Sequence, residues 1–244
     1  MNATVDIVIP VLNEEVALPG CIEKLQAFTA DYPERDWRII VADNGSTDRT
    51  TAIATELAAK HSNLSVTRLD QRGRGRALKK VWSESDAEVR LYMDVDLSTG
   101  LKALPTLVAA IADDGYEVAI GSRLMKGSEV IDRTLKREIT SRGYNILIHM
   151  FFPLTKFKDA QCGFKAISRR TADNLIPLIE DNAWFFDTEL LLLAGKAGYG
   201  IKEVPVHWED DPDTRVNIVS TAWKDVKGLL RLRFKGRPVP PSAP

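Results

Sequence analysis

Two carboxylates one residue apart, Asp94 and Asp96, are the first candidates for chemistry in this sequence. They end an apolar run of strand-forming residues that begins at Val89, and the polar Ser98 follows them. A buried strand that delivers side chains to its carboxyl end places them where open α/β sheets bind ligands. Two carboxylates in such a place can hold a hard divalent cation, Mg²⁺ or Mn²⁺, which usually bridges protein and phosphate oxygens. The same spacing also arises by chance in acidic loops, so further motifs are needed to choose between these interpretations.

Other common catalytic patterns are absent from the sequence. It has no Gly-x-Ser-x-Gly elbow and no Walker-type phosphate loop. A dinucleotide-binding enzyme or a nucleotidyltransferase would want a glycine-rich turn after the first strand, where this chain has Pro10-x-x-Asn13-Glu14. The three histidines are isolated, and Cys162 beside Gly163 suggests packing. Carboxylates, arginines and a cation without a protein nucleophile suit direct transfer between two bound substrates, with the cation neutralising a phosphate leaving group.

The composition is typical of a soluble globular protein. Of the 244 residues, 44% are hydrophobic and 27% are charged. With 33 basic and 34 acidic side chains, the charge balance gives no general reason to expect nucleic acid as a partner. Two cysteines are too few for a disulfide framework or a zinc cluster, and the N-terminus does not resemble a signal peptide, so we expect a reducing cytoplasm.

The most apolar stretch, residues 144–154, is shorter than the ~20 residues of a membrane span, and Pro153 interrupts it. It is interpreted either as a core helix or as a patch that touches a membrane surface or a partner. Basic residues lie directly before it, namely Arg133, Lys136, Arg137 and Arg142. These could form a solvated basic face. Positive charge next to apolar surface also suits a phosphate head with a long apolar tail, and an anionic membrane.

The elements that must position the acids alternate regularly in the first half of the chain. Strands are predicted at residues 5–9, 38–42, 64–69 and from 89, with helices after the first three. This rhythm predicts a largely parallel sheet with helices on both faces. Three of the strands lead into loops that carry Glu14, Asp43 with Asp48, and Asp94 with Asp96. Because the carboxyl ends of parallel strands meet at one edge of a sheet, these acids should gather there.

The second half is less regular. We expect a helix over 102–112, a strand over 118–120, a helix that ends at 176 after the segment 159–165, a strand over 202–208 and a helix over 221–233. The sequence shows no internal repeat and no linker, so residues 1–235 are predicted to form one domain. The proline-rich residues 236–244 are expected to be disordered.

Six motifs in this order resemble those of glycosyltransferase family two, the inverting enzymes with a GT-A fold. The early motifs are Pro10-x-x-Asn13-Glu14, residues 43–48 and Asp94-x-Asp96. The later ones, residues 121–123, the basic segment up to 142 and residues 161–165, narrow the resemblance to polyprenyl-phosphate (dolichyl-phosphate) sugar synthases, and residues 186–191 and 204–206 also fit. The resemblance spans residues 5–233. Two departures, Leu12 for Tyr and Asn44 for Asp, affect the expected base preference more than the fold.

This resemblance implies an α/β GT-A fold, with a mostly parallel central sheet and helices on both faces. A Rossmann-like nucleotide-sugar-binding half would cover about residues 1–100, and an acceptor-binding half about residues 101–235. The implied reaction moves a hexose, glucose from UDP-glucose first, to a polyprenyl monophosphate of the dolichyl, undecaprenyl or decaprenyl type, with Mg²⁺ or Mn²⁺. A lipid monophosphate has a second pKa of about 6 and is largely ionised at neutral pH, so it could attack without a general base.

The resemblance also implies roles for individual residues. The nucleotide-sugar site would be formed by Pro10, Leu12, Glu14, Asp43, Arg74, Asp94, Val95, Asp96 and Arg215. The cation would be held by Asp94, Asp96 and Ser98, the acceptor by Arg123, Arg137 and Gln161, and the residues acting directly in catalysis would be Asp96, Arg123 and Arg137. Arginine suits these sites because its planar fork of donors matches phosphate oxygens.

Two alternative functions stay open at this point. A family-two enzyme with a soluble saccharide or protein acceptor would need a base near Asp187 or Glu189, although Glu189 is better explained as a structural partner of an arginine. A catalytically silent nucleotide-sugar-binding subunit is the other alternative. The donor could also carry N-acetylgalactosamine or be GDP-mannose. The resemblance further implies peripheral attachment at the cytoplasmic face of a membrane, with a small integral-membrane protein as a possible partner.

Overall fold

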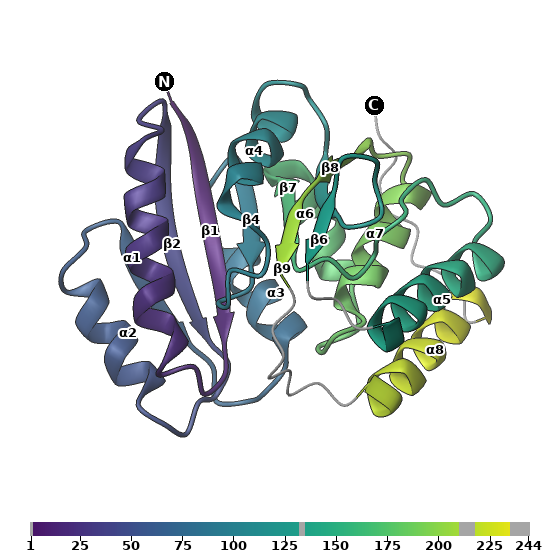
Figure 1. Cartoon of the computed structure of the whole chain (residues 1–244), viewed down its shortest axis with the longest axis horizontal. Helices are drawn as coiled ribbons and strands as arrows, with labels where there is room; N and C mark the ends of the chain where they lie inside the picture. Colours follow the sequence, from purple (N-terminus) through teal and green to yellow (C-terminus); the bar gives the residue numbers. More distant parts are fainter. Residues whose placement is uncertain (1, 132–134, 210–217, 235–244) are drawn as a thin grey trace.

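The computed structural model describes residues 2–131, 135–209 and 218–234, and a seven-stranded sheet forms its centre (Figure 1). The strand order is β3-β2-β1-β4-β7-β5-β8, and β7 alone runs antiparallel to its neighbours β4 and β5. The strands of this sheet are β1 (Ala3–Val11), β2 (Arg35–Asp43), β3 (Leu64–Arg68), β4 (Val89–Met93), β5 (Val118–Ser122), β7 (Phe164–Ser168) and β8 (Ile201–Pro205). The mostly parallel sheet predicted from the sequence is therefore confirmed.

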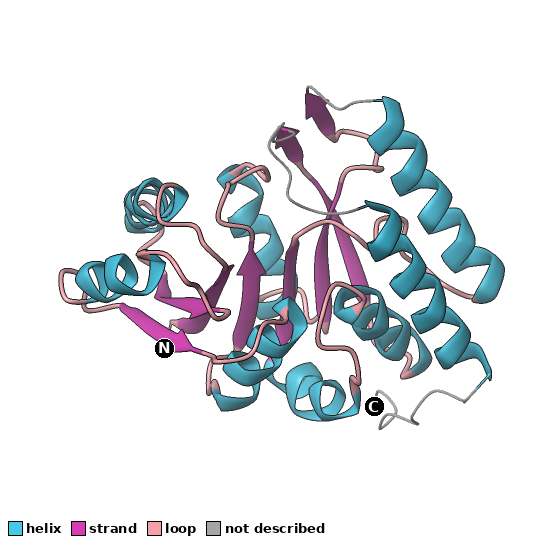
Figure 2. Cartoon of the chain, turned by 90° about the horizontal axis from the view of Figure 1, so that it is seen from below, coloured by secondary structure: helices cyan, strands magenta, loops and turns pink. Residues whose placement is uncertain are grey.

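Helices cover both faces of the sheet (Figure 2). They are α1 (Ala17–Ala30), α2 (Thr50–Ala58), α3 (Arg74–Glu84), α4 (Leu104–Ala112), α5 (Leu135–Phe151), α6 (Arg169–Leu175), α7 (Phe186–Lys196) and α8 (Ile218–Phe234), with short 3-10 turns at Leu101–Ala103 and Ile176–Leu178. One apolar core lies between the sheet and α1, α2 and α4, and the other between the sheet and α3, α5, α6, α7 and α8. Successive residues of β1 divide between the two cores, as the pleat of a strand requires: Ile7 and Ile9 face one and Val8 the other.

Two features of the sheet differ from the sequence-based expectation. Residues 164–168 form β7, a strand that was not predicted between the segment 159–165 and the following helix. Four of its five residues are buried, because helices cover the sheet on both sides, so β7 has no alternation of apolar and polar residues. The strand predicted over 202–208 is divided into β8 and β9 (His207–Glu209), and β9 pairs with β6 (Glu129–Ile131) in a separate small sheet.

The first strand, predicted over residues 5–9, is longer in the structure and runs from Ala3 to Val11 as β1. The ladder between β1 and β2 includes Pro10, whereas the ladder between β1 and β4 stops at Val8. Pro10 therefore lies where only one side of the strand is paired, a position that tolerates the missing N–H of proline.

The apolar stretch 144–154 divides between core and surface. Tyr144, Ile148 and Phe152 are buried, whereas Ile146 and Met150 are exposed. Helices α5 and α8 lie side by side at one end of the molecule in both views (Figures 1 and 2). Within the described ranges, the helices are too short or too polar to cross a bilayer. Residues 235–244, predicted to be a disordered tail, are outside the described part of the chain.

Candidate functional site

The loops that follow β1, β2 and β3 are tied together at the carboxyl edge of the sheet. Asn13 donates its backbone N–H to Ser46 Oγ at 3.0 Å, and Glu14 donates its own to Thr50 Oγ1 at 2.8 Å. The loop after β3 joins them, because Gly73 donates its N–H to Asn44 Oδ1 at 2.6 Å. Strand β4 is also a parallel neighbour of β1, so the acidic loops after β1, β2 and β4 lie at the same edge of the sheet, as the strand rhythm predicted.

Four residues expected at the nucleotide-sugar site lie at the ends of β1 and β2 or directly after them. Asp43 ends β2 and is fully buried, and its carboxylate accepts hydrogen bonds from the Ser46 N–H at 2.9 Å and from the Thr51 hydroxyl. Pro10, Leu12 and Glu14 follow one another along the end of β1 and are only partly buried. The structure thus brings the four predicted residues to one edge, with a fixed Asp43 carboxylate and three partly accessible neighbours.

Arg74, at the start of α3, lies on the carboxylate of Asp94 at the end of β4. Its Nη2 is 2.6 Å from Asp94 Oδ1. The guanidinium carbon also lies over two aromatic rings, 4.9 Å from the centroid of Tyr92 and 4.8 Å from that of Trp184. Burial raises the pKa of Asp94, while the charge of Arg74 opposes that rise. Arg74, expected at the nucleotide, is therefore held beside the first acid of the Asp-x-Asp motif.

Asp96 is exposed at the tip of the turn after β4. Its Oδ1 accepts the backbone N–H of Ser98 at 2.9 Å, and Leu97 between them has a positive φ of 56°. Val95 is half-buried, and Ser98 is buried. The strand β9 holds the far side of this turn, because Glu209 donates its N–H to the Ser98 carbonyl at 2.9 Å.

The donor set of this turn fits a hard divalent cation. No group of three or more His, Cys, Asp or Glu side chains that could hold a metal occurs among the described residues, so a cation here would rest on the two carboxylates of Asp94 and Asp96. Mg²⁺ in particular is commonly held by one or two carboxylates together with substrate phosphates, rather than by an all-protein cage. The accessible Asp96 carboxylate next to the partly accessible Asp94 therefore suits Mg²⁺ or Mn²⁺ shared with a diphosphate.

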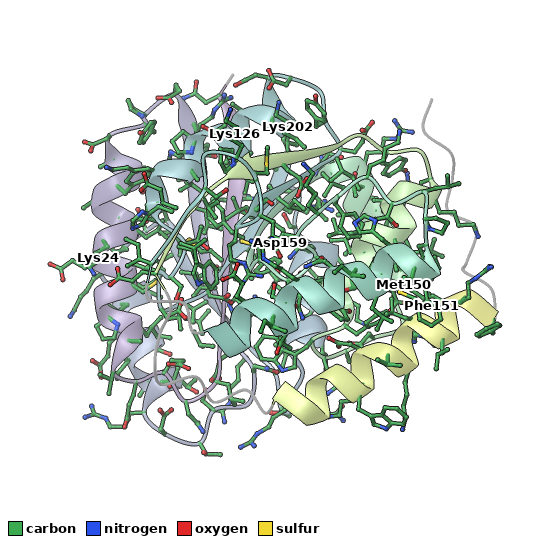
Figure 3. All side chains as sticks on the ribbon, turned by 45° about the vertical axis from the view of Figure 1, so that its right-hand side comes forward. Lys24, Lys126, Met150, Phe151, Asp159 and Lys202 are labelled. Carbon is green, nitrogen blue, oxygen red and sulfur yellow. The ribbon has the colours of Figure 1, made fainter. Side chains whose placement is uncertain are left out.

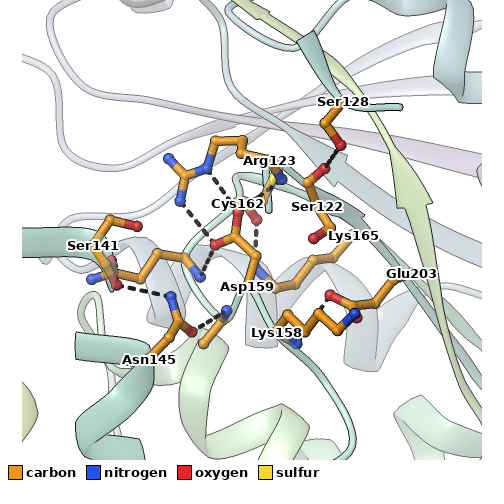
Figure 4. A network of polar contacts seen from close by, with 12 residues as sticks. Ser122, Arg123, Ser128, Ser141, Asn145, Lys158, Asp159, Cys162, Lys165 and Glu203 are labelled. Carbon is orange, nitrogen blue, oxygen red and sulfur yellow. Dashed lines mark hydrogen bonds and ion pairs between the residues drawn. The ribbon is translucent and has the colours of Figure 1, made fainter. Parts of the chain in front are cut away.

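A second polar centre lies around Arg123 at the end of β5 (Figure 4). Its Nε and Nη2 donate to the two carboxylate oxygens of Asp159 at 2.8 and 2.9 Å, and its guanidinium lies 4.8 Å from the ring centroid of Trp208. Burial alone would raise the pKa of Asp159, but the charge and hydrogen bonds of Arg123 lower it to about 2. Gln161, also expected at the acceptor, donates its backbone N–H to Asp159 Oδ1 at 3.1 Å.

An open cavity of about 500 Å³ adjoins this centre. Its lining includes Arg123, Ser128, Glu138 and Arg142, so two cations and one carboxylate face it. Arg142 donates to Glu138 at 2.9 Å on the surface of α5. The cavity is large enough for a phosphate group, and Arg123 forms part of its wall.

Sequence reasoning missed the buried charges that hold these loops. Asp159 and Lys165 are both fully buried, and Lys165 contacts Asp187 at 3.2 Å and the Cys162 carbonyl. Asp187 also accepts a hydrogen bond from the Tyr92 hydroxyl. The available signal was a lysine inside an apolar strand, since a charge at a core position requires a buried partner.

Three predicted positions cannot be placed in the site. Arg215 and Arg133 lie outside the described residues, and Arg137 lies on α5 with its side chain outside the described part of the structure. Glu189 is fully buried, and its carboxylate accepts hydrogen bonds from Arg231 Nη2 at 2.6 Å and from the Asp181 N–H at 2.9 Å. Its expected pairing with an arginine is confirmed.

Comparisons with known proteins agree with this arrangement. The sequence profile described as "Glycosyl transferase family 2" matches residues 6–176. Glycosyltransferase AglD of Haloferax volcanii is 37% identical over 230 residues, covering 92% of this chain but 35% of AglD, so the chain spans about a third of that relative. A dolichyl-phosphate beta-glucosyltransferase of Dictyostelium discoideum is 29% identical, with 96% of this chain and 75% of the relative covered.

Solved structures share the fold. Glucosyl-3-phosphoglycerate synthase of Mycobacterium tuberculosis superposes with a TM-score of 0.69 at 20% identity, covering 96% of this chain and 81% of that one. Crystals of the same synthase with Mn²⁺, UDP and glucosyl-3-phosphoglycerate give a TM-score of 0.69 at 18% identity. At these identities the likeness shows the GT-A fold alone. Because the family profile covers well over half of the sequence, the chain belongs to glycosyl transferase family 2.

Proposed function

We propose that this protein transfers glucose from UDP-glucose to a polyprenyl monophosphate of the dolichyl type, with inversion at the anomeric carbon. The observation that carries the proposal is the link between the carboxylate turn and the arginine centre. Thr99, three residues after Asp96, forms a β-bridge with Trp208, and the Trp208 ring stacks on Arg123. A diphosphate held at the turn and a phosphate held at Arg123 would therefore lie against the same short strand, β9.

The chemistry of the site supports an acceptor that needs no base. A phosphate monoester with a second pKa of about 6 is already largely ionised at neutral pH and can attack directly. The two acids considered as bases for a hydroxyl acceptor are both engaged elsewhere. Asp187 is bound by Tyr92 and Lys165, and Glu189 by Arg231. This favours the lipid phosphate over a soluble saccharide or protein hydroxyl.

The names of the relatives support the same acceptor and sugar. Besides the Dictyostelium relative, a dolichyl-phosphate beta-glucosyltransferase of Drosophila melanogaster is 31% identical, with 84% of this chain and 66% of the relative covered. Crystals of the solved synthase contain UDP-glucose and Mn²⁺, which supports UDP-glucose as donor and Mg²⁺ or Mn²⁺ as cofactor. In the proposed site the donor would contact the loops of Pro10, Leu12, Glu14 and Asp43, and the cation would contact Asp94 and Asp96, with Ser98 beside them.

An apolar face on α5 and α8 supports attachment to a membrane surface. Met150 and Phe151 lie near the end of α5 beside α8 (Figure 3), and Met150 is 74% exposed. Other exposed apolar residues of these two helices are Ile139, Ile146, Trp223, Leu230 and Phe234. Lys224 and Lys227 are exposed on α8, and the Lys227 amine lies 5.3 Å from the Trp223 ring centroid. Apolar side chains flanked by lysines suit the interface of an anionic bilayer.

We therefore propose that the face formed by Ile139, Ile146 and Met150 of α5 and Trp223, Leu230 and Phe234 of α8 lies on a membrane. This face adjoins the cavity at Arg123 through Glu138 and Arg142 of α5. A polyprenyl tail could thus stay in the bilayer while its phosphate reaches Arg123. Attachment at the cytoplasmic face and a small integral-membrane partner, both implied by the family resemblance, belong to this proposal.

The test is transfer from a panel of UDP- and GDP-sugars to a polyprenyl phosphate, with Mg²⁺, with Mn²⁺ and with a chelator. We expect a mild-acid-labile lipid-linked glucose from UDP-glucose only, and none with chelator. Asp96→Asn should lower turnover at least about 100-fold. Glu189→Gln, on a carboxylate outside the proposed site, should keep turnover once its fold has been verified.

Other outcomes separate the alternatives. Donor binding without transfer to the lipid would favour a soluble acceptor or a requirement for a membrane partner. Near-complete loss with folded Glu189→Gln would favour a hydroxyl acceptor with Glu189 as base. Binding of UDP-glucose that is unaffected by Asp96→Asn, together with no transfer to any acceptor, would favour a silent subunit. A protein that binds no nucleotide sugar would contradict the whole proposal.

A further inference from the structure

One buried carboxylate, that of Asp159, joins several parts of the arginine centre. Asp159 lies in the interior of the molecule (Figure 3) and is fully buried. It accepts the backbone N–H of Arg123 at 3.0 Å, the side-chain Nε and Nη2 of Arg123, and the backbone N–H of Gln161. A single side chain therefore fixes the end of β5, the Arg123 guanidinium and the loop that carries Gln161 (Figure 4).

The bidentate contact fixes the direction of the guanidinium. The planar fork of arginine has five N–H donors in fixed positions, and Asp159 takes one from Nε and one from Nη2. A phosphate would then have to meet the guanidinium along its Nη1–Nη2 edge. The Trp208 ring, 4.8 Å from the guanidinium carbon, restricts rotation of the plane from one side. The Arg123 side chain is only 10% exposed, so few other orientations are open to it.

The negative charge of Asp159 opposes the binding of an anion at Arg123, so electrostatic attraction cannot be its contribution to phosphate binding. Its pKa of about 2 means that it stays ionised at any pH at which the enzyme would work. A carboxylate in direct contact with Arg123 reduces the positive potential that a phosphate meets. If attraction were all that mattered, the site would bind phosphate better without this carboxylate. Asp159 therefore helps phosphate binding only if the gain from fixing the orientation of Arg123 outweighs the reduced positive potential.

We propose that Asp159 is a positioning residue for the acceptor phosphate, which aims Arg123 into the cavity beside α5. This inference rests on the proposed function, because it assigns the phosphate of the acceptor to the Arg123 centre. The two buried oxygens of Asp159 act through Arg123 and touch no substrate.

The experiment measures binding of farnesyl monophosphate, a short soluble acceptor, by calorimetry, alongside the KM values for both substrates. We expect Asp159→Asn to weaken farnesyl monophosphate binding and to raise the acceptor KM at least about tenfold, because a neutral amide can no longer hold the fork in two places. The KM for UDP-glucose should stay within about twofold. Tighter or unchanged binding of farnesyl monophosphate would overturn the proposal, since tighter binding is the result of a purely electrostatic role.

A double-mutant cycle tests whether Asp159 acts through Arg123. In an Arg123→Gln background, adding Asp159→Asn should change farnesyl monophosphate binding by less than about twofold. The same large loss in both backgrounds would overturn the proposal. If Asp159→Asn alone fails to fold, Asp159→Glu keeps the charge and shifts the carboxylate. Weaker binding by that variant supports positioning, and unchanged binding contradicts it.

Glu189→Gln is the matched control. Like Asp159, Glu189 is a fully buried carboxylate that accepts an arginine and two backbone N–H groups. The Glu189→Gln variant should leave farnesyl monophosphate binding unchanged. A loss equal to that of Asp159→Asn would mean that the removal of any buried charge weakens the site.

The wild-type protein distinguishes this inference from the proposed function. Binding of farnesyl monophosphate without glucose transfer, even with native membranes added to supply a membrane partner, would contradict the proposed function and leave the positioning role intact. No binding would overturn the positioning role.

Discussion

The carboxylate of Asp94 lies directly against the backbone of Gly163. A Cβ atom added at Gly163 would lie 1.8 Å from Asp94 Oδ2 and 3.1 Å from Arg74 Nη2. Glycine is required here because of this close approach and not because of its backbone angles. The segment that carries Gln161 therefore packs on the carboxylate turn, so the proposed acceptor loop and the proposed donor turn are in contact.

Gly163→Ala should disrupt the donor site while leaving the fold intact. The added methyl group forces the Asp94 carboxylate to rotate away from Arg74, at a cost of about 1–3 kcal/mol in stability. We expect the affinity for UDP in the presence of Mn²⁺ to fall at least about tenfold, measured by calorimetry. Gly195→Ala is the control, because a Cβ at that helical position meets nothing within 4 Å. Unchanged UDP affinity in Gly163→Ala would show that the Asp94 geometry does not matter for the donor.

At the scale of elements, helix α5 has two different apolar sides. Tyr144 and Ile148 are spaced by four residues and pack into the core, while Ile146 and Met150, with the same spacing, are exposed. One side of this helix therefore belongs to the core, and the opposite side leaves apolar side chains exposed, as the proposed membrane face requires. A test of the surface side must leave Phe152 unchanged, because its loss would cost about 3–5 kcal/mol of core packing.

Ile146→Ser combined with Met150→Ser should weaken membrane attachment. Each exposed apolar side chain contributes about 1.5–3 kcal/mol when fully buried, so we expect at least about tenfold weaker partition to anionic vesicles in a sedimentation assay. The acceptor KM should rise more for a long polyprenyl phosphate than for farnesyl monophosphate. Val16→Ser is the matched control, since Val16 is 90% exposed and lies next to α1 at the far end of the molecule (Figure 1). Equal effects on both acceptors would count against the membrane face.

At the scale of the whole molecule, a buried acid lies where α8 meets the body. Asp225 is 4% exposed, and burial raises its pKa to about 7, with the charges of Asp181 and Asp187 adding to the rise. The Tyr144 hydroxyl of α5 faces this acid and also lies 2.9 Å from Thr188 Oγ1 of α7. The junction of α5, α7 and α8 thus contains a carboxyl group that prefers its proton in the folded state.

Asp225→Asn should change how stability depends on pH. An unfolded Asp loses its proton near pH 3.9, whereas folded Asp225 keeps it to about pH 7, so the wild type loses unfolding free energy as pH rises through this window. The variant lacks this loss. We expect the free energy of unfolding of the variant, measured with urea, to exceed that of the wild type by almost nothing at pH 4. The difference should grow to at most about 4 kcal/mol by pH 7. An advantage that does not change with pH would contradict the assignment.

The sequence by itself determined the first half of the fold and the acids at its carboxyl edge. Compact β-branched runs followed by polar turns are local signals, so four strands and the acids at their shared edge could be placed without tertiary information. The order of the motifs was enough to indicate the family. The pairing of Glu189 with an arginine was also predictable, because a buried charge on an apolar helix requires a partner.

Tertiary structure decided the features that depend on residues far apart in the chain. β7 was not predicted because burial on both faces removes the alternation that marks a strand. Arg74 and Asp94 are separated by 20 positions, and Arg123 and Asp159 by 36, so their pairing could not be read from spacing. Which apolar residues of α5 reach the core was equally undetermined, because a single stretch of sequence does not show which of its sides another element covers. Contacts between distant segments form only when the chain has folded, and no local pattern encodes them.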